Sequence, residues 1–477
     1  MATENYKHRR YVGGKESLSY VLFDSSKSFH IDEFKTRFVV DVLKIDLGWN
    51  TVIDMINGIW DIINDGLLGA LIDKTKTRWG KFRPYLLAHS TIGTFFLALY
   101  WLAPLFLGKD PRSLAKAAVW LLLTMTFETF STVKDIGETG MVSCMSPNPS
   151  DKVRLYTLAE VISSIWESLP SLIMGALIDL VNHNKVGFSM DAVYMSMGAF
   201  TVIAGGGLVL AFALLARERV SQAVEHYKFS EGLRAIMRNK PLLLLLISEF
   251  FGGFKVETWE HNYYIDVLGG ASLRNLVRLP GAPLSFLSYT YINKVRERYP
   301  IKSLWIFGKH LQDACSLVVF AIGSVGGLYR KVVPMVALLM IRNLFYMGTL
   351  SVNKIIPKEI VLDSLDYAEW NTGFRSEGTI LAAKSMVGKI TRNVLNSMTT
   401  LIMKMTGYSL EAGFGQQSAK AQYALFAMSF GLPALMGAFA LIPKLFYDLT
   451  GAKRAKMFEE LTEMRKRRQA EYDTLEA

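Results

Sequence analysis

Cysteine is nearly absent from this chain of 477 residues, which contains only Cys144 and Cys315. Both lie in apolar surroundings and show no metal-ligand spacing, so we expect two small reduced residues in a core. The chain also has no GxSxG, Walker, HExxH or CxxC motif. These absences argue against an enzyme, and nothing in the sequence points to a bound cofactor.

The chain also lacks interdomain linkers, and three long segments of it lack charged residues. A length of 477 residues would suit about three soluble domains, yet no Pro, Ser or Gly-rich linker divides the chain. Charged residues are absent from three long segments, Pro84 to Gly108, Ala192 to Ala216 and Ala421 to Pro443. Twenty-five residues at about 1.5 Å each can cross a hydrocarbon core of about 30 Å. A mean hydropathy of +0.24 is unremarkable for a soluble protein, so this distribution is the more informative signal.

The net charge of +11 does not indicate nucleic-acid binding, because the basic residues are spread over turns between apolar segments. The densest of these turns, Lys74 to Arg83, will be called the basic turn. It follows the segment IWDIINDGLLGALID, which begins at Ile59.

An acidic stripe runs along the helix expected before the basic turn. Residues three, four, seven and eleven apart share one helical face, and the stripe consists of Asp54, Asn57, Asp61, Asn64 and Asp65. Ionisable side chains inside a membrane usually face an interior and mark an ion or substrate path. The alternative is a soluble amphipathic helix with a solvated acidic face.

Three motifs resemble one known family. The first is WDIINDG followed by IDKTKTRWGKFRPYLL, and the others are RLPGAPLSFLSYTYINKVRERYPIK from Arg278 and LDYAEWNTGFRSEG from Leu365. Together they resemble the glycoside-pentoside-hexuronide:cation symporters, the melibiose-carrier branch of the major facilitator superfamily. The resemblance implies an all-α integral membrane protein of twelve transmembrane helices in two six-helix halves.

We therefore expect twelve helices. Their approximate ranges are Ser17–Val42, Leu47–Ile72, Pro84–Leu107, Leu114–Val142, Val153–Leu180, Ala192–Leu215, Pro241–Leu268, Ser272–Ile292, Ser303–Val325, Val332–Ile356, Ser376–Met405 and Ala421–Leu445. The expected domains are residues 1–216, a cytosolic linker 217–240, residues 241–450 and a cytosolic tail 451–477. The basic turn, the residues after the eighth helix and the linker carry most Lys and Arg, so both termini are expected in the cytosol.

A weak internal repeat supports two homologous halves. Residues 73–79, DKTKTRW, align with residues 293–299, NKVRERY, at an offset of 220 residues. Transporters built from two such halves bind their substrate near the middle of the membrane. The N-terminal residues lack the apolar core of a cleavable signal, and we expect a multi-pass monomer in the inner (plasma) membrane. The lipid bilayer and a small sugar are its expected partners.

The resemblance implies a sugar site with carboxylates from the first and fourth helices. The matching positions are Asp24 or the adjacent Ser25 and, in the fourth helix, Asp135. Gly137, Glu138 and Thr139 replace the proline and aromatic residue usual after Asp135. The expected substrate-binding residues are Asp24, Ser25, Asp135, Thr139 and Glu160. The first helix also carries surplus charges, which leave open a charged substrate, pairing within the helix, or a sensor or scaffold that has lost transport.

The coupling cation is expected on the acidic stripe. Asp61 and Asp65 lie one turn apart and Asn64 adds a neutral oxygen, a set that suits a monovalent metal ion such as Na+ or Li+. Two close carboxylates can instead share a proton, so Na+, Li+ and H+ all remain open. The resemblance places a charge-balancing lysine at Lys389.

A cytosolic gate is expected at the basic turn. Its cationic side chains would pair with acidic residues expected in the loop between the tenth and eleventh helices. The gate residues are Asp73, Arg78, Lys81, Arg83, Asp366 and Glu369.

Overall fold

The computed structural model describes most of the chain and divides it into two compact units. The described residues are 11–28, 30–75, 77–146, 155, 158–159, 162–163, 169–219, 229–254, 257–372, 377–409, 412 and 414–476. The first unit comprises Met1–Glu225, Gly270–Ser272 and Asn396–Phe414. The second unit comprises His226–Gly269, Leu273–Leu395 and Gly415–Ala477.

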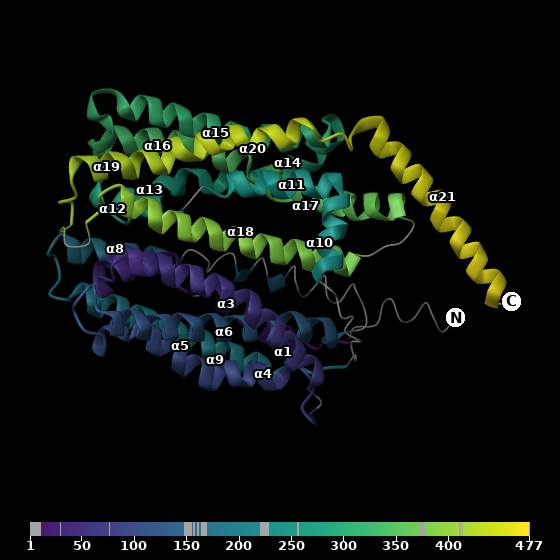
Figure 1. The fold of residues 1–477 in the computed structure, drawn as a ribbon, viewed down its shortest axis with the longest axis horizontal. Coiled ribbons are helices and arrows are strands. Elements are labelled where there is room, and N and C mark those ends of the chain that lie inside the picture. Colours follow the sequence, from purple (N-terminus) through teal and green to yellow (C-terminus); the bar gives the residue numbers. More distant parts are fainter. Residues whose placement is uncertain are drawn as a thin grey trace. The chain divides into compact units, whose positions relative to one another are not determined.

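The regular secondary structure described in the first unit is helical, apart from an isolated bridge between Thr77 and Gly80 (Figure 1). Its α-helices are α1 (Gly14–Ser28), α2 (Lys35–Arg37), α3 (Leu47–Lys74), α4 (Arg83–Ala88), α5 (Thr94–Trp101), α6 (Leu114–Met145), α8 (Leu169–Asn182) and α9 (Met190–Leu215). A π-helical turn, His89–Gly93, joins α4 to α5, so the expected third helix is nearly continuous. Within this unit α3 packs along α6, and α1 packs along α9.

The expected first helix is interrupted, which corrects the prediction of one helix over Ser17–Val42. Helix α1 ends at Ser28, and the chain resumes with a 3-10 turn at Asp32–Phe34, the short α2 and a π-helical turn at Phe38–Leu43. The Asp32 backbone N–H donates to Nδ1 of His30 over 3.2 Å. A side chain that takes a backbone N–H in this way competes with the helical ladder.

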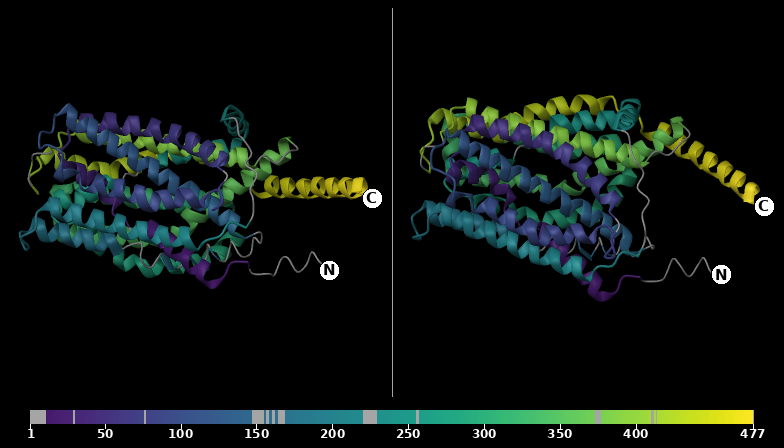
Figure 2. Two further views of the ribbon diagram at one scale, coloured as in Figure 1. Left: turned by 90° about the horizontal axis from the view of Figure 1, so that it is seen from below. Right: turned by 60° about the horizontal axis from the view of Figure 1, so that its bottom comes forward.

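The second unit is also helical over its described part. Its α-helices are α10 (Phe229–Arg238), α11 (Lys240–Gly252), α12 (Glu257–Asp266), α13 (Leu273–Arg278), α14 (Ala282–Arg298), α15 (Ile301–Ser324), α16 (Val332–Gly348), α17 (Leu350–Thr372), α18 (Glu377–Met405), α19 (Ala419–Phe426), α20 (Leu432–Leu445) and α21 (Gly451–Glu476). The last turns of α18 belong to the first unit. Helix α21 projects from its unit as one long rod (Figure 2).

Two expected loops of the second unit prove to be helical. Helix α14 continues to Arg298, so Arg296 and Arg298 lie on a helix end and not in a loop. Helix α17 continues to Thr372, which places Asp366 and Glu369 on a helix and buries Glu369. The extension of α14 follows from a run without Gly or Pro, which gives the helix no reason to stop where hydrophobicity ends. Helix α17, in contrast, continues through Pro357, which lies inside it.

Aromatic side chains fill the core of each unit. In the first unit the Phe38 ring contacts Trp101 and Tyr194 at centroid distances of 5.0 and 5.5 Å. In the second unit the Phe426 ring contacts Tyr263 at 5.6 Å and Tyr329 at 5.3 Å. Gly198 lets α9 approach Trp101 closely, because a Cβ there would meet the indole ring at 2.3 Å.

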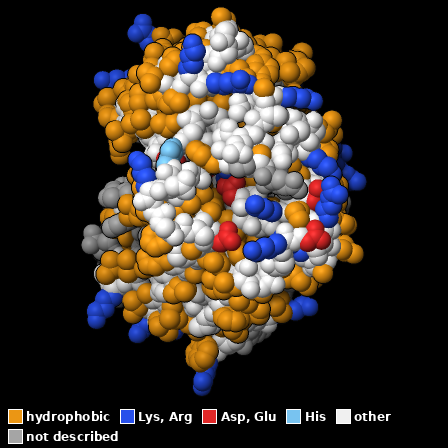
Figure 3. All heavy atoms as spheres, turned by 90° about the vertical axis from the view of Figure 1, so that its left-hand side faces the viewer, with side chains coloured by type: hydrophobic (Ala, Val, Ile, Leu, Met, Phe, Trp, Pro, Cys, Tyr) orange, Lys and Arg blue, Asp and Glu red, His pale blue; other side chains and the backbone are white. Residues whose placement is uncertain are grey.

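Large apolar side chains are also exposed along many helices. Leu67 on α3 is 60% exposed, Phe286 on α14 72% and Val333 on α16 81%, and apolar side chains cover much of the face in Figure 3. In the described part, Met190–Leu215, Ile301–Arg330 and Ala419–Leu445 are long and apolar enough to span a membrane, with the bent pair α16 and α17 a fourth candidate. Contact with lipid explains this exposure better than contact with water, which speaks against the soluble alternative.

Candidate functional site

The acidic stripe lies on α3, a helix of 28 residues that begins with a side-chain cap. The Asp46 carboxylate accepts the backbone N–H groups of Gly48 at 2.8 Å and Trp49 at 3.4 Å. Four residues into the helix, Asn50 donates to Asp54 over 3.2 Å, and Thr400 donates to the same Asp54 oxygen over 2.9 Å. The half-buried Asp54 is thus held by two neutral donors.

The next turns of α3 contain the predicted cation ligands. Asp61 and Asp65 are half-buried, and Asn64 between them is 3% exposed. The amide Nδ2 of Asn64 is buried without a hydrogen-bond partner in the described structure. Because a half-turn of the amide exchanges its nitrogen and oxygen, Asn64 can present either atom at this position. A buried amide end beside two carboxylates can therefore serve as a neutral oxygen ligand.

Two threonine hydroxyls of α6 form hydrogen bonds with side chains of α3. Thr124 donates to Asn57 over 3.2 Å, and the Trp60 indole N–H donates to Thr129 over 3.0 Å. These bonds anchor the stripe to a neighbouring helix of the same unit, so its carboxylates are positioned by packing as well as by α3 itself. In the described part of the chain there is no group of three or more His, Cys, Asp or Glu that could hold a metal ion.

A second polar group, which will be called the α1/α6 cluster, contains Asp24, Lys27 and Glu138. The Lys27 ammonium lies 3.0 Å from Asp24 and contacts Glu138 on α6. Tyr20 donates to the same Glu138 oxygen over 3.5 Å, and Ser163 donates to Asp24 over 2.7 Å. Glu138 also lies in the field of the Lys134 ammonium. The remaining lone pairs of the two carboxylates can accept hydrogen bonds from hydroxyl groups.

The other predicted sugar residues have varied environments. Ser25 is buried and donates its hydroxyl to the Val21 carbonyl over 2.8 Å, a bond within α1. Asp135 is exposed on α6 and has interactions of its own. The Thr139 side chain and Glu160 lie outside the described structure. Of the predicted residues, the structure brings Asp24 into the α1/α6 cluster, together with the unpredicted Lys27, Glu138 and Ser163.

The surplus charges of the first helix are largely paired near their own positions. Lys35 lies 3.5 Å from Asp32 and 3.6 Å above the centroid of the Phe127 ring. Arg37 is buried, pairs with Asp41 at 2.8 Å and donates to the Tyr408 hydroxyl over 2.9 Å. This agrees with the alternative that the charges pair within the segment.

The backbone of the basic turn is hydrogen-bonded to Glu218. The Glu218 carboxylate accepts the backbone N–H groups of Lys81, Phe82 and Arg83 at 2.7 to 3.1 Å. The Arg83 guanidinium donates to the Leu214 carbonyl over 2.7 Å, and Arg78 is exposed beside the Trp79 ring. The Asp73 side chain lies outside the described structure. Pairing of this turn with Asp366 and Glu369 stays a prediction, as does charge balance by the half-buried Lys389.

The second unit contains a half-buried arginine that sequence reasoning missed. Arg342 on α16 donates from Nε to Ser316 on α15 over 3.0 Å and from Nη1 to Glu260 on α12 over 3.3 Å. Its guanidinium carbon lies 5.1 Å from the centroid of the Phe430 ring. A signal was present, because Arg342 is the only charged residue in VVPMVALLMIRNLFYMG. Glu138 also had a signal, since it lies three residues after Asp135 on the same helix.

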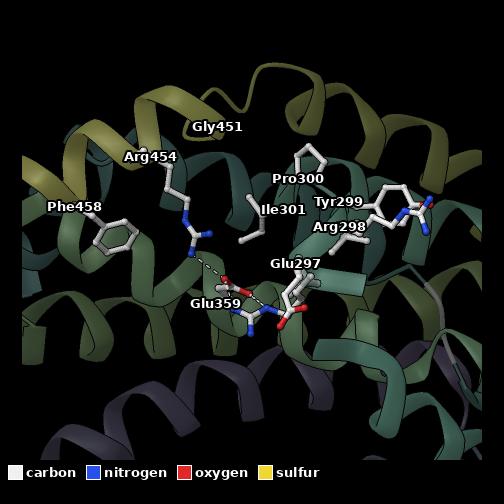
Figure 4. Close-up of a pocket in the computed structure, with 13 residues that line it drawn as sticks. Glu297, Arg298, Tyr299, Pro300, Ile301, Glu359, Gly451, Arg454 and Phe458 are labelled. Carbon is white, nitrogen blue, oxygen red and sulfur yellow. Dashed lines mark hydrogen bonds and ion pairs between the residues drawn. The ribbon is translucent and has the colours of Figure 1, made fainter. Parts of the chain in front are cut away.

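A separate cavity of about 480 Å³ in the second unit is lined by residues of α14, α15, α17 and α21 (Figure 4). Glu359 on α17 accepts from Arg296 on α14 at 2.5 and 2.7 Å and from Arg454 on α21 at 2.8 Å. Arg454 also lies 2.7 Å from Asp363. The shared carboxylates tie α21 to α17, so this cavity belongs to the attachment of the tail helix.

A second ionic contact lies at the start of the tail helix. Asp448 lies 3.0 Å from Lys240 and 2.9 Å from Lys453. Partial burial alone would raise the pKa of this carboxyl, but the hydrogen bonds and charges of the two lysines outweigh it, and the net pKa is lowered from 3.8. The carboxylate form is therefore stabilised where α21 begins.

Sequence relatives point to transport. The chain is 25% identical to the inner membrane symporter YicJ of Escherichia coli over 97% of this chain and 98% of that protein. It is 24% identical to the isoprimeverose transporter of Lactiplantibacillus pentosus over 93% and 90%. The lactose permease of Lactobacillus delbrueckii is 23% identical over 93% of this chain and 69% of the permease.

Solved structures show the same fold. The nucleoside transporter NupG aligns with a TM-score of 0.56 at 14% identity, over 91% of this chain and 99% of that structure. The Escherichia coli xylose transporter XylE aligns with a TM-score of 0.51 at 12% identity, over 89% and 96%. The family model described as MFS/sugar transport protein matches residues 18–451. The resemblance carried by the three motifs is thereby confirmed, and the chain belongs to the MFS/sugar transport family of transporters, not to a family of enzymes.

Proposed function

We propose that the protein is a secondary active transporter that couples symport of a glycoside, pentoside or hexuronide to Na+, Li+ or H+ by alternating access. Two separate carboxylate groups inside the first unit carry this proposal. The acidic stripe on α3 supplies oxygen ligands for a cation, and the α1/α6 cluster supplies acceptors for hydroxyls. Two distinct sites are what coupling needs, since each solute must bind without displacing the other.

The exposure of the acidic stripe favours binding of a monovalent cation over a purely structural role. Asp61 and Asp65 are only half-buried, so both can reach an incoming ion, and the buried Asn64 amide lies between them in the helix. Hard cations take such oxygen ligands. A carboxylate oxygen can bind H+ as well as a metal ion, so the proposal keeps Na+, Li+ and H+ as coupling ions.

The α1/α6 cluster suits a polyhydroxyl compound. Asp24 is held by Ser163 and Lys27, while Glu138 is held by Lys27 and Tyr20. Held carboxylates can accept hydrogen bonds from neighbouring sugar hydroxyls without first losing their own orientation. Asp135, three residues before Glu138, adds a further acceptor to this proposed site. Relatives named for lactose and isoprimeverose transport support a sugar as the substrate.

Membrane topology follows from the same proposal. We place twelve transmembrane helices in the inner (plasma) membrane, with both termini in the cytosol and the protein as a monomer. The concentration of Lys and Arg in the basic turn and in the linker supports this orientation. The charged residues within several helices explain why composition alone reveals only a few spans, since such residues are tolerated when they face a protein interior.

A transport-deficient sensor is the alternative. Its basis is the surplus charge of the first helix, and the pairing of Asp32 with Lys35 and of Arg37 with Asp41 gives part of that charge a local structural role. The test is uptake of a labelled sugar panel into proteoliposomes, with and without an imposed Na+ or H+ gradient. We expect gradient-driven accumulation of at least one sugar. Tight binding without translocation would support the sensor instead.

A further inference from the structure

The first unit contains a small cavity, which will be called the α6/α9 cavity. Its volume is about 100 Å³, and its lining residues come from α1, α5, α6, α9, the chain just after α1 and the π-helical turn that joins α4 to α5. No residue of the acidic stripe or of the α1/α6 cluster lines it. At about 30 Å³ per water molecule, it has room for about three waters, or for a hydroxymethyl group with a neighbouring hydroxyl.

Lys134 on α6 brings a positive charge to the α6/α9 cavity without an ion pair. The side chain is half-buried and lines the cavity. In the described structure its ammonium group makes no hydrogen bond, and no carboxylate lies within ion-pair distance of it. A charge inside a membrane protein is costly unless it is paired or has a function. The N–H donors of Lys134 are therefore available to an acceptor in the cavity.

His89, in the π-helical turn, supplies a fixed acceptor to the same cavity. His89 is 5% exposed, and its Nδ1 lies 2.9 Å from the carbonyl oxygen of Phe130. Because a carbonyl oxygen only accepts, Nδ1 carries the hydrogen, and Nε2 of the neutral ring is left as an acceptor. In the described structure Nε2 makes no hydrogen bond, and it is not among the fully buried atoms without a partner. The Nε2 lone pair can therefore be reached from the cavity.

The remaining lining combines polar groups with aromatic walls. Ser131 on α6 makes no hydrogen bond in the part of the chain that the structure describes, so its hydroxyl can donate or accept. The Asp32 carboxylate is 38% exposed and lies 3.5 Å from Lys35. Trp101 and Phe127 add aromatic rings to the lining. A few convergent polar groups among aromatic side chains are typical of a small-molecule site.

The chemistry of the lining limits what the cavity can bind. A ligand must accept from Lys134 and donate to His89. An inorganic anion has no hydrogen to donate and is repelled by the carboxylate of Asp32, whereas a metal cation is repelled by the Lys134 ammonium. Hydroxyl groups donate and accept at once. The aromatic walls favour a ligand that also has C–H groups over water alone.

We propose that the α6/α9 cavity is a subsite for a neutral, hydroxyl-bearing end of the substrate. Lys134 is its donor and His89 its acceptor. This inference rests on the proposed transport function and adds a specificity-determining cavity to it. Because the volume is about 100 Å³, the cavity admits a hydroxymethyl group or a pair of adjacent hydroxyls and excludes a second sugar ring.

The first test fills the cavity without removing a polar group. Gly205 on α9 lines the cavity, and a Cβ there would meet nothing closer than the Ser26 carbonyl oxygen at 3.9 Å. Leucine at this position would extend into the cavity, and we expect Gly205→Leu to weaken sugar binding at least about tenfold. Gly207→Leu is the matched control, because Gly207 lies on the same helix, is exposed and does not line the cavity.

The second test removes single hydroxyls from the sugar. The probe is the neutral methyl glycoside of glucose or galactose, whichever binds the wild type more tightly, and it is compared with its 3-, 4- and 6-deoxy analogues by titration into the purified full-length protein. We expect the wild type to bind the probe at least about tenfold more tightly than one of these analogues. That difference should fall below about threefold in His89→Phe and in Lys134→Met, because the hydroxyl then has lost its partner.

Controls separate a local effect from a loss of folding. Lys134→Arg keeps a charged donor and should retain part of the difference between the probe and its analogue. Lys185→Met removes an exposed lysine of the same unit and should bind all the sugars like the wild type. Thermal melting of each purified variant shows whether it is folded.

The outcomes separate this inference from the function on which it rests. A folded Gly205→Leu variant that binds and accumulates the probe like the wild type would overturn the subsite and leave the transport proposal standing. Preference for the hydroxyl that survives in both His89→Phe and Lys134→Met would also overturn it and leave the cavity to water only. If the wild type neither bound nor accumulated any of these sugars, the subsite would be overturned and the transport proposal weakened as well.

Discussion

The two units share an all-helical architecture but differ in the sign of charge that their helices carry. In the first unit, α1, α3 and α6 present mainly carboxylates, namely Asp24, Asp54, Asp61, Asp65, Asp135 and Glu138. In the second unit, α15, α16 and α18 present Lys309, Arg342, Lys384, Lys389 and Arg392. The second unit also has carboxylates: Glu260 lies beside Arg342 and Asp313 beside His310, and α17 carries Glu359, Asp363, Asp366 and Glu369.

This difference suggests a division of labour. Carboxylates bind cations and sugar hydroxyls, whereas guanidinium and ammonium groups bind acidic oxygens. We therefore assign the coupling ion and the hydroxyl contacts to the first unit. Changes in the first unit should alter coupling and substrate affinity, and changes in the second unit should leave coupling intact.

The largest expected effect concerns the acidic stripe. Asp61→Cys removes one of two carboxylates that we assign to the cation, and we expect it to abolish accumulation of substrate against a gradient while sparing cation-free binding. Uptake into proteoliposomes under an imposed ion gradient measures this. Ile63→Cys, at an exposed position two residues further along α3, is the matched control and should still accumulate substrate.

The next effect concerns the hydroxyl contacts of the first unit. Asp135→Asn is expected to weaken substrate binding at least about tenfold, because loss of a charged acceptor from a binding site costs about 1 to 3 kcal/mol. Calorimetric titration measures the affinity directly. Asp191→Asn changes an exposed carboxylate on α9 and should bind like the wild type. Unchanged affinity in Asp135→Asn would remove this residue from the site.

A smaller effect, on stability, is expected where the tail helix α21 attaches to α17. It can be measured without substrate. Glu359→Gln leaves the Arg296 and Arg454 guanidinium groups near one another without the carboxylate they share. We expect a loss of about 2 kcal/mol in stability, seen as a lower melting temperature of the purified protein. Glu297→Gln, an exposed lining residue of the same cavity, should have little effect.

The smallest effect is expected at Asp448. Its pKa is lowered in the folded protein, so its contribution is present above the ordinary value of 3.8 and is lost as the pH falls below that value. Because the side chain is 43% exposed, the contribution is about 1 kcal/mol or less. Asp448→Asn should therefore lower the melting temperature slightly near pH 7 and by less near pH 3. An equal effect at both values would contradict the ion-pair explanation.

The sequence predicted the bounds of a helix well where an apolar run begins at a side-chain cap, as in α3. Helix α3 was expected over Leu47–Ile72 and spans Leu47–Lys74. The helix expected over Pro241–Leu268 is instead divided into α11 and α12, and α11 ends at Gly252. The interruption after Ser28 was not predictable from periodicity, and a local bond from the Asp32 N–H to His30 lies just beyond it. Helix α17 continues through Pro357 to Thr372, past the end expected at Ile356.

The site was predictable only in part. Carboxylates three or four residues apart on one helix are visible in a sequence, which is why the stripe on α3 was found. Contacts between distant segments are not visible, and the bonds from Lys27 to Glu138, Thr400 to Asp54 and Arg342 to Glu260 are all of this kind. A lone charge in an apolar helix indicates a function but does not identify its partner.

The most direct test of the division of labour is the effect of the cation on substrate affinity. The neutral methyl glycoside is titrated into wild-type protein, Asp61→Cys and Arg342→Gln, each with and without Na+, Li+ or a lowered pH. Coupled sites typically change each other's affinity by about 5- to 150-fold. We predict that the cation strengthens binding to the wild type and to Arg342→Gln but not to Asp61→Cys. Cation dependence that survives in Asp61→Cys, or that disappears in Arg342→Gln, would contradict the assignment of the coupling ion to the first unit.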